Sequence, residues 1–204
     1  MLTPSLGSLA AFNVSRESLE RLEVLVKLLL DWQKHINLIA PSTIPDIWNR
    51  HIVDSLQLLP LLPPGTQAIA DLGSGAGFPA LVLAGTQPGL VHMYETNAKK
   101  AAFLSEALRQ MKCAGVVRRE RLPTKAALPL VQVVTARAFA ALPLLLNLAG
   151  PFINRGAVGL FHKGQDVDTE LNEAAKTWKI SYEKHPSVTD SQSVILAVKE
   201  ISHA

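Results

Sequence analysis

The chain has 204 residues, of which 48% are hydrophobic and 18% are charged, and its formal net charge is +3. A chain of this kind can bury one substantial core, and the lack of any run of about 18 consecutive apolar residues argues against a membrane-spanning helix. Its one cysteine, Cys113, excludes an internal disulfide and a paired-cysteine metal or redox site. We therefore expect a cytoplasmic monomer without a metal site, and the small excess of positive charge permits a polyanionic partner.

Residues 1–64 are expected to form a helical extension that precedes the main domain, residues 65–204. From Ser15, a plausible N-cap, apolar side chains recur at the three-and-four spacing of an amphipathic helix. We expect this helix to end between Asn37 and Pro41.

A second helix is expected to begin at Thr43, with Asp46 as its capping partner, and to continue as far as a proline-rich linker. At about 3.6 residues per turn, this helix would bring Arg50, His51 and Asp54 close together on its surface. The three side chains form either a functional polar cluster or an ordinary surface with an ion pair between Arg50 and Asp54.

The sequence IADLGSGAGFPALVLA, which follows the linker, predicts a strand, a tight turn and a helix. Glycines alternate at Gly73, Gly75 and Gly77, so the backbone can adopt positive φ angles and approach a ligand without interference from a Cβ atom. A dinucleotide-binding loop would have a small residue in place of Phe78, and a carboxylate at the mouth of the loop, Asp71, would repel a pyrophosphate but attract a cation. S-adenosylmethionine, with its sulfonium and amino groups, is such a cationic ligand.

A second strand is expected to end at Glu95, about twenty residues beyond the glycine loop. A carboxylate at this place can accept hydrogen bonds from both hydroxyls of a ribose. The combination of strand, glycine loop, helix, strand and terminal acid therefore indicates a cofactor site. The alternative is a cluster of turn-forming glycines with a solvated glutamate.

Strand and helix patterns alternate through the rest of the chain, which predicts a mainly parallel sheet with helices on both faces and ligands at the carboxyl ends of its strands. The last two strands are joined by about ten residues without a helix, so they should form an antiparallel hairpin at the sheet edge. The expected α/β, Rossmann-like fold has strands near residues 68–73, 90–95, 115–119, 131–136, 157–162, 179–184 and 193–200. Its helices are expected at residues 78–86, 98–111, 141–153 and 166–177.

Charged residues gather at the ends of the third, fourth and fifth expected strands. After the third, Arg118 and Arg119 precede Glu120, which either accepts a hydrogen bond from an adenine amino group or neutralises its neighbours. Arg137 ends the fourth strand, where a planar guanidinium can anchor the cofactor, hold a phosphate or bind a base. Lys163 ends the fifth strand and should point into the same crevice.

Two lysines, Lys99 and Lys100, open one of the expected helices. The dipole of a helix disfavours cations at this end. An external anion could therefore be their partner, and the alternative is a solvated pair of side chains.

Taken together, these stretches resemble the RsmG family, also called glucose-inhibited division protein B, of class I methyltransferases that act on the RNA of the small ribosomal subunit. The matching motifs occur in one order over most of the chain, which is more specific than any single motif. They are W-x-x-x-I-N-L from Trp32, R-H-I-x-D-S-L from Arg50, D-x-G-S-G-A-G-F-P from Asp71, K-K-x-x-F-L from Lys99, R-x-E from Arg118, T-A-R-A from Thr135 and K-G from Lys163.

The resemblance implies transfer of a methyl group from S-adenosylmethionine to N7 of one guanine in 16S ribosomal RNA, either naked or in a small-subunit particle. With the candidates from the residue patterns, the expected cofactor contacts are Asp71, Gly73, Gly75, Phe78, Glu95, Arg119, Glu120 and Arg137. The expected RNA contacts are Arg50, His51, Asp54, Lys99, Lys100, Arg118 and Lys163.

Guanine N7 has an in-plane lone pair and no proton, so its methylation needs no general base and depends on alignment with the methyl group and sulfur. We expect Arg137 and Lys163 to position the base or its phosphate. A cation beside N7 would oppose the positive charge that the base gains, which favours anchoring over catalysis for both side chains. The alternatives are a methyltransferase for small molecules and a non-catalytic sensor of NAD or an adenosine ligand.

Overall fold

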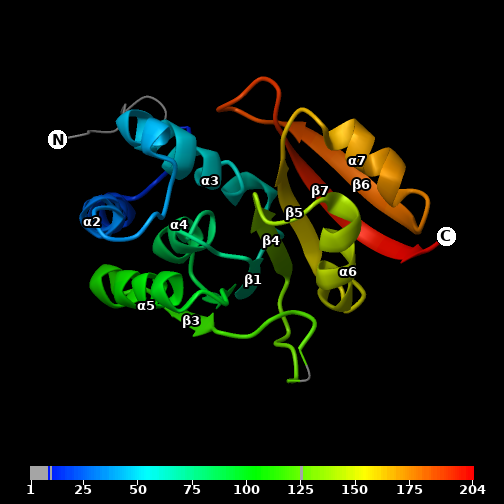
Figure 1. Cartoon of the computed structure of the whole chain (residues 1–204), viewed down its shortest axis with the longest axis horizontal. Helices are drawn as coiled ribbons and strands as arrows, with labels where there is room; N and C mark the ends of the chain where they lie inside the picture. Colours follow the sequence, from blue (N-terminus) through cyan, green and yellow to red (C-terminus); the bar gives the residue numbers. More distant parts are fainter. Residues whose placement is uncertain (1–8, 10, 125) are drawn as a thin grey trace.

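Seven strands form one sheet in the computed structural model, which describes residues 9, 11–124 and 126–204 (Figure 1). The strands are β1 (Ala68–Leu72), β2 (Leu90–Tyr94), β3 (Gly115–Arg118), β4 (Val133–Arg137), β5 (Val158–Lys163), β6 (Trp178–Pro186) and β7 (Val194–His203). Their order is β3-β2-β1-β4-β5-β7-β6. Adjacent strands from β3 to β5 are parallel, whereas β7 is antiparallel to β5 and β6. The predicted strands, parallel core and edge hairpin are therefore confirmed.

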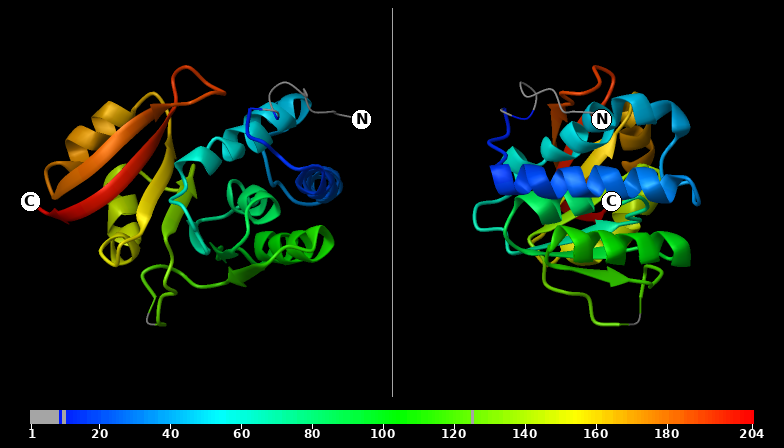
Figure 2. Two further views of the ribbon diagram at one scale, coloured as in Figure 1. Left: turned by 180° about the vertical axis from the view of Figure 1, so that it is seen from behind. Right: turned by 90° about the vertical axis from the view of Figure 1, so that its left-hand side faces the viewer.

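Helices cover both faces of this sheet (Figure 1). The helices α4 (Ala80–Thr86) and α5 (Ala98–Met111) pack on one face, and α2 (Arg16–Gln33) lies alongside α5, as the right-hand view of Figure 2 shows. The other face is covered by α6 (Leu142–Ile153) and α7 (Val167–Ala174). The four helices predicted between the strands are thus confirmed. Within the described ranges, none of the helices is both long enough and apolar enough to cross a lipid bilayer.

The first predicted helix begins as expected but ends early. Ser15 caps α2 with its side chain, as predicted, but α2 ends at Gln33 and does not reach Asn37. The reason is a competing set of hydrogen bonds, because the Gln33 side-chain oxygen accepts from the backbone N–H groups of Leu38 and Ile39, at 2.9 and 3.0 Å. These bonds turn the chain and bring Leu38 and Ile39 to the lining of a cavity described below.

The prediction of one second helix is wrong. Four short helical segments of different types replace it: η1 (Pro41–Asp46, a 3₁₀ helix), η2 (Trp48–Val53, a π-helix), α3 (Asp54–Leu56) and η3 (Leu59–Leu61, a 3₁₀ helix). Pro45 lies inside η1 and has no N–H to donate to a continuous α-helix. The predicted capping pair is also absent, because Thr43 donates its hydroxyl proton to the Ala40 carbonyl (2.7 Å) and Asp46 accepts from the side chain of Asn49 (3.3 Å).

The N-terminal segment shares one hydrophobic core with the sheet. Leu29 and Leu56 are fully buried in the same cluster as Phe103 of α5, and the ring of Trp32 meets that of Phe103 edge-on at a centroid distance of 5.6 Å. Burial of each large apolar side chain stabilises this contact by about 1.5–3 kcal/mol. The described part of the predicted extension therefore packs against the domain; residues 1–8 and 10 lie outside the described residues.

Candidate active site

Two cavities lie side by side beyond the carboxyl ends of the parallel strands. The glycine-loop cavity, of about 870 Å³, has a lining that includes Gly73, Gly75, Phe78, Tyr94, Glu95 and Glu120. The hairpin cavity, of about 680 Å³, has a lining that includes Arg50, Asp54, Lys163, Glu170, Ser187 and Asp190. Both cavities are lined by His51, Arg137, Ala138, Phe139 and Ala140. The two cavities therefore adjoin at this shared wall.

The glycine loop between β1 and α4 has the backbone that its sequence predicts. Gly73, Gly75 and Gly77 have φ angles of 69°, 55° and 87°, which side-chain-bearing residues rarely adopt. A Cβ atom at Gly73 would lie 2.0 Å from a ring carbon of Phe139. Only glycine therefore fits at the first of these positions.

Phe139 is a site residue that the sequence patterns did not single out. Its ring lies against Gly73, and the residue, which is 39% exposed, borders both cavities. The residue before it, Ala138, has a positive φ of 49°, so the chain turns sharply as it leaves β4. The signal in the sequence was its place directly after the T-A-R-A motif at a strand end.

Glu95 holds the glycine loop from the end of β2. Its Oε2 accepts a hydrogen bond from the backbone N–H of Gly75 (2.9 Å), and its Oε1 accepts from that of Asn97 (2.7 Å). A carboxylate has about four lone-pair sites, so two remain for a ligand. The structure thus brings Glu95 beside the loop, where its sequence position suggested.

Asp71 lies beneath the glycine loop rather than at its mouth, which corrects the expected position. It is 1% exposed and does not line the glycine-loop cavity, because β1 is flanked by β2 and β4 and encloses it. Its Oδ1 accepts from the Thr135 hydroxyl at 2.6 Å, whereas its buried Oδ2 has no hydrogen-bond partner. Burial raises the pKa of Asp71 to about 6, against the lowering effect of its hydrogen bonds. At neutral pH the carboxylate is therefore largely ionised.

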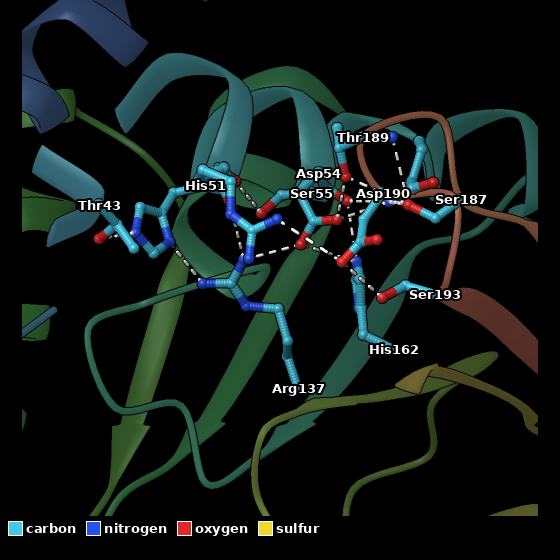
Figure 3. A network of polar contacts seen from close by, with 12 residues as sticks. Thr43, His51, Asp54, Ser55, Arg137, His162, Ser187, Thr189, Asp190 and Ser193 are labelled. Carbon is cyan, nitrogen blue, oxygen red and sulfur yellow. Dashed lines mark hydrogen bonds and ion pairs between the residues drawn. The ribbon is translucent and has the colours of Figure 1, made fainter. Parts of the chain in front are cut away.

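Arg137 occupies the shared wall, and Figure 3 shows its guanidinium between His51 and Asp54. Its Nη1 donates to Asp54 Oδ2 (2.8 Å) and to the Arg50 carbonyl (3.1 Å), and its Nη2 donates to His51 Nδ1 (2.7 Å). The guanidinium also lies 5.4 Å from the centroid of the Phe78 ring. The motif around residue 50 and the end of β4 therefore form one site.

His51 is 7% exposed and stacks on Phe78 at a centroid distance of 4.9 Å. Burial, reinforced by the neighbouring Arg137 charge, lowers the pKa of His51 to about 4. The ring is therefore neutral at physiological pH. Because its Nδ1 accepts from Arg137, its Nε2 carries the proton and donates to Thr43 Oγ1 (2.9 Å).

The suggested surface ion pair between Arg50 and Asp54 is wrong. Asp54 points inward to Arg137, while Arg50 faces Asp190 in the loop between β6 and β7 at 3.7 Å. The π-helical winding of η2 explains the difference, because residues four apart are not stacked in its wider turn as they are in an α-helix.

Lys163 is buried, at 7% exposure, and lines the hairpin cavity. Its Nζ donates to Glu170 Oε2 of α7 (2.7 Å) and to the Ala140 carbonyl (3.0 Å). The sequence patterns did not single out Glu170, since it lies in a helix with no motif of its own. Together, these bonds hold the ammonium group at the wall of the cavity.

A family model described as GidB, rRNA small subunit methyltransferase G, matches residues 18–197. The chain belongs to this family. Relatives named Ribosomal RNA small subunit methyltransferase G are 48% identical over 191 residues in Rhodospirillum rubrum and 45% identical over 190 residues in Paramagnetospirillum magneticum. The matches cover 94% of this chain and 94% of the first relative, and 93% and 92% for the second. The resemblance seen in the sequence motifs is confirmed.

Solved structures share the fold of this GidB-family chain at low sequence identity. An O-methyltransferase from Bacillus cereus in complex with SAH has a TM-score of 0.61 and 13% identity, with 89% of this chain and 91% of that chain covered. Cofactor-bound Rv0187 from MTB has a TM-score of 0.58 and 15% identity, with 89% and 90% covered. The Rossmann-like methyltransferase fold is thus confirmed.

Of the remaining predicted site residues of this GidB-family chain, some line the glycine-loop cavity and others lie outside both cavities. Glu120 and Lys100 line the glycine-loop cavity, whereas Arg119 and Lys99 are exposed and line neither cavity. Arg118 also lies outside both, with its guanidinium 3.6 Å from Glu120 and 5.9 Å from the Tyr94 ring centroid. Within residues 9, 11–124 and 126–204, no group of three or more histidine, cysteine, aspartate or glutamate side chains could hold a metal ion.

Proposed function

We propose that this chain transfers a methyl group from S-adenosylmethionine to N7 of one guanine of 16S ribosomal RNA. The observation that carries this proposal is the pair of adjoining cavities with Arg137 and Phe139 in their shared wall. A methyl donor in one cavity and a base in the other would be neighbours across this wall, and direct transfer requires that the two reacting atoms approach each other there. The names of the relatives support ribosomal RNA as the substrate.

The residues of the glycine-loop cavity fit the methyl donor. A Cβ atom at Gly75 would come no nearer than 3.7 Å to the Gly73 carbonyl oxygen, so the glycine leaves this space open to a ligand, and Glu95 retains lone pairs for two ribose hydroxyls. Glu120 can accept from an adenine amino group, and the ionised Asp71 beneath the loop favours a cation above it. When bound, S-adenosylmethionine supplies a methyl group on a positively charged sulfur.

The residues of the hairpin cavity fit an RNA segment. Arg50 supplies positive charge for a phosphate, and Lys163, which already donates to Glu170 and Ala140, retains one N–H for a phosphate or a base carbonyl. The exposed Phe139 offers a ring face on which a base can stack. No proton must be removed from guanine N7, and the neutral His51 adds no cation beside the charge that the base gains. Lys99 and Lys100, at the N-terminus of α5, extend the surface available to the phosphate backbone.

The function is tested by mass spectrometry of 16S ribosomal RNA from cells with and without the gene. We expect one 7-methylguanosine to disappear without the gene and to return when purified protein and S-adenosylmethionine are added to the extracted RNA or small-subunit particle. Binding to RNA should weaken steeply as salt rises. Unchanged RNA together with turnover of a free metabolite would favour a small-molecule methyltransferase, and binding of NAD in preference to S-adenosylmethionine would favour a sensor.

Glu95→Ala should weaken S-adenosylmethionine binding by about tenfold, because it removes the acceptor of the ribose hydroxyls and frees the Gly75 N–H. Isothermal titration calorimetry measures the change. Glu173→Ala, which removes an exposed carboxylate paired with Lys176 on the surface, is the matched control and should leave the affinity unaltered. Equal affinities of Glu95→Ala and the native protein would contradict this role.

A further inference from the structure

We propose that Asp54 is a positioning residue, whose carboxylate fixes the Arg137 guanidinium at the junction of the two cavities and links it to the loop between β6 and β7. This role rests on the proposed function and assigns Asp54 an action through Arg137 rather than contact with RNA.

Both carboxylate oxygens of Asp54 are engaged inside the protein. Oδ2 accepts from Arg137 (2.8 Å), and Oδ1 accepts from the Thr189 hydroxyl (2.8 Å) and the Gln57 amide (2.8 Å). The side chains of Asp54 and Arg137 are only 15% and 18% exposed. A carboxylate so enclosed has little surface to offer RNA, whose phosphates would in any case repel it.

The contacts of Arg137 show what Asp54 orients. A guanidinium is planar, and here its two terminal nitrogens are held at once, one by Asp54 and the other by the neutral ring of His51. His51 is uncharged, so the Asp54 carboxylate supplies the negative charge that pairs with the guanidinium and fixes its plane. Loss of that ion pair would leave the guanidinium held by two uncharged acceptors, His51 and the Arg50 carbonyl, so its position in the shared wall would be less well fixed.

Asp54 also joins segments that are far apart in the chain (Figure 3). Its backbone carbonyl accepts from His162 Nε2 of β5 (2.8 Å), while Gln57 accepts from the Val188 N–H (3.1 Å). Through its carboxylate, Asp54 therefore ties the N-terminal segment and β4 to the loop that forms the far wall of the hairpin cavity. The position of Arg137 and the attachment of that loop therefore depend on the same carboxylate.

The test is a double-mutant cycle on methylation of 16S ribosomal RNA. Asp54→Asn keeps the shape of the side chain but removes its charge, and we expect kcat/KM to fall by about ten- to a hundredfold, as for a small misplacement of a positioning group. In Arg137→Ala, the same substitution should cause no further loss, because the residue through which it acts is gone. The control, Glu106→Gln, breaks an exposed carboxylate–guanidinium pair with Arg109 and should leave activity unchanged.

Thermal melts accompany each variant, since a merely structural role would lower stability and reduce activity to the same extent with or without Arg137. If Asp54→Asn does not fold, Thr189→Val provides the same cycle: it removes one donor to the carboxylate and should reduce kcat/KM about tenfold only when Arg137 is present. Additive losses, or full activity of Asp54→Asn, would overturn the positioning role. Failure of the native protein to methylate the RNA would instead refute the proposed function, so the two failures are distinguishable.

Discussion

Arg137→Ala should reduce kcat/KM for methylation of 16S ribosomal RNA by roughly a hundred- to a thousandfold, the largest single-residue effect that we expect. The substitution removes the side chain that borders both cavities and leaves the Asp54 carboxylate without its cation. It also removes the donor to His51 Nδ1. The site would then lose one side chain of its shared wall and gain an unpaired, largely buried charge.

Because a cation beside guanine N7 opposes the charge that develops there, we expect this loss mainly in the binding of RNA or donor. Filter binding for RNA and calorimetry for S-adenosylmethionine, alongside single-turnover rates, separate binding from chemistry. Arg109→Ala, which removes an exposed guanidinium of α5, is the matched control. A loss confined to the chemical step, with both affinities intact, would contradict anchoring.

Asp71→Asn should weaken binding of S-adenosylmethionine by about ten- to thirtyfold but change binding of S-adenosylhomocysteine, which lacks the sulfonium charge, much less. Asp71 does not touch the glycine-loop cavity, so its effect on a ligand is that of a buried charge beneath the loop. Its pKa is raised to about 6, so the carboxylate becomes ionised as the pH increases through that value. The affinity of the native protein for the cationic donor should therefore increase over the same range. Calorimetry with both ligands on either side of about pH 6 measures the difference.

The same substitution should also alter the pH dependence of stability. The folded pKa of Asp71 is raised from an ordinary 3.8 to about 6, so its favourable contribution is present below the unfolded pKa and is lost as the pH rises through about 6. The free energy of unfolding of Asp71→Asn minus that of the native protein should therefore increase by about 2 kcal/mol as the pH is raised from about 4 to about 8. Denaturant titrations at the two pH values measure this, with Glu200→Gln, which changes an exposed carboxylate of β7, as control. A difference that does not change with pH would show that Asp71 titrates normally.

The order of strands and helices was predictable because it depends on local patterns. Alternating apolar residues mark strands, three-and-four spacing marks helices, and glycines at alternate positions mark the loop after β1. These patterns located every strand of the described sheet and the helices between them to within a few residues. The positive φ angle of Gly73 was predictable for the same local reason, whereas the Phe139 ring that packs against this glycine was not.

The second helix shows where local patterns were insufficient. Its apolar spacing suited an α-helix, but Pro45 lacks the N–H that a continuous helix needs. In addition, residues 48–53 form a wider π-helical turn, and Asp54, which follows it, points inward and binds Arg137. Whether Asp54 paired with Arg50 or with Arg137 could not be read from spacing, since Asp54 and Arg137 are 83 positions apart.

By itself, the sequence determined the Rossmann-like fold, the family and the glycine loop, because each of these is recognised from short local patterns and from their order along the chain. Only the tertiary structure decided that Asp71 is enclosed beneath the loop, that Phe139 lies over Gly73 and that Asp54 joins Arg137 to Thr189, which is 135 positions away. The physical reason is that these relations depend on which strands become neighbours: placing β4 between β1 and β5 brings their carboxyl ends to one edge, where the N-terminal segment packs over them.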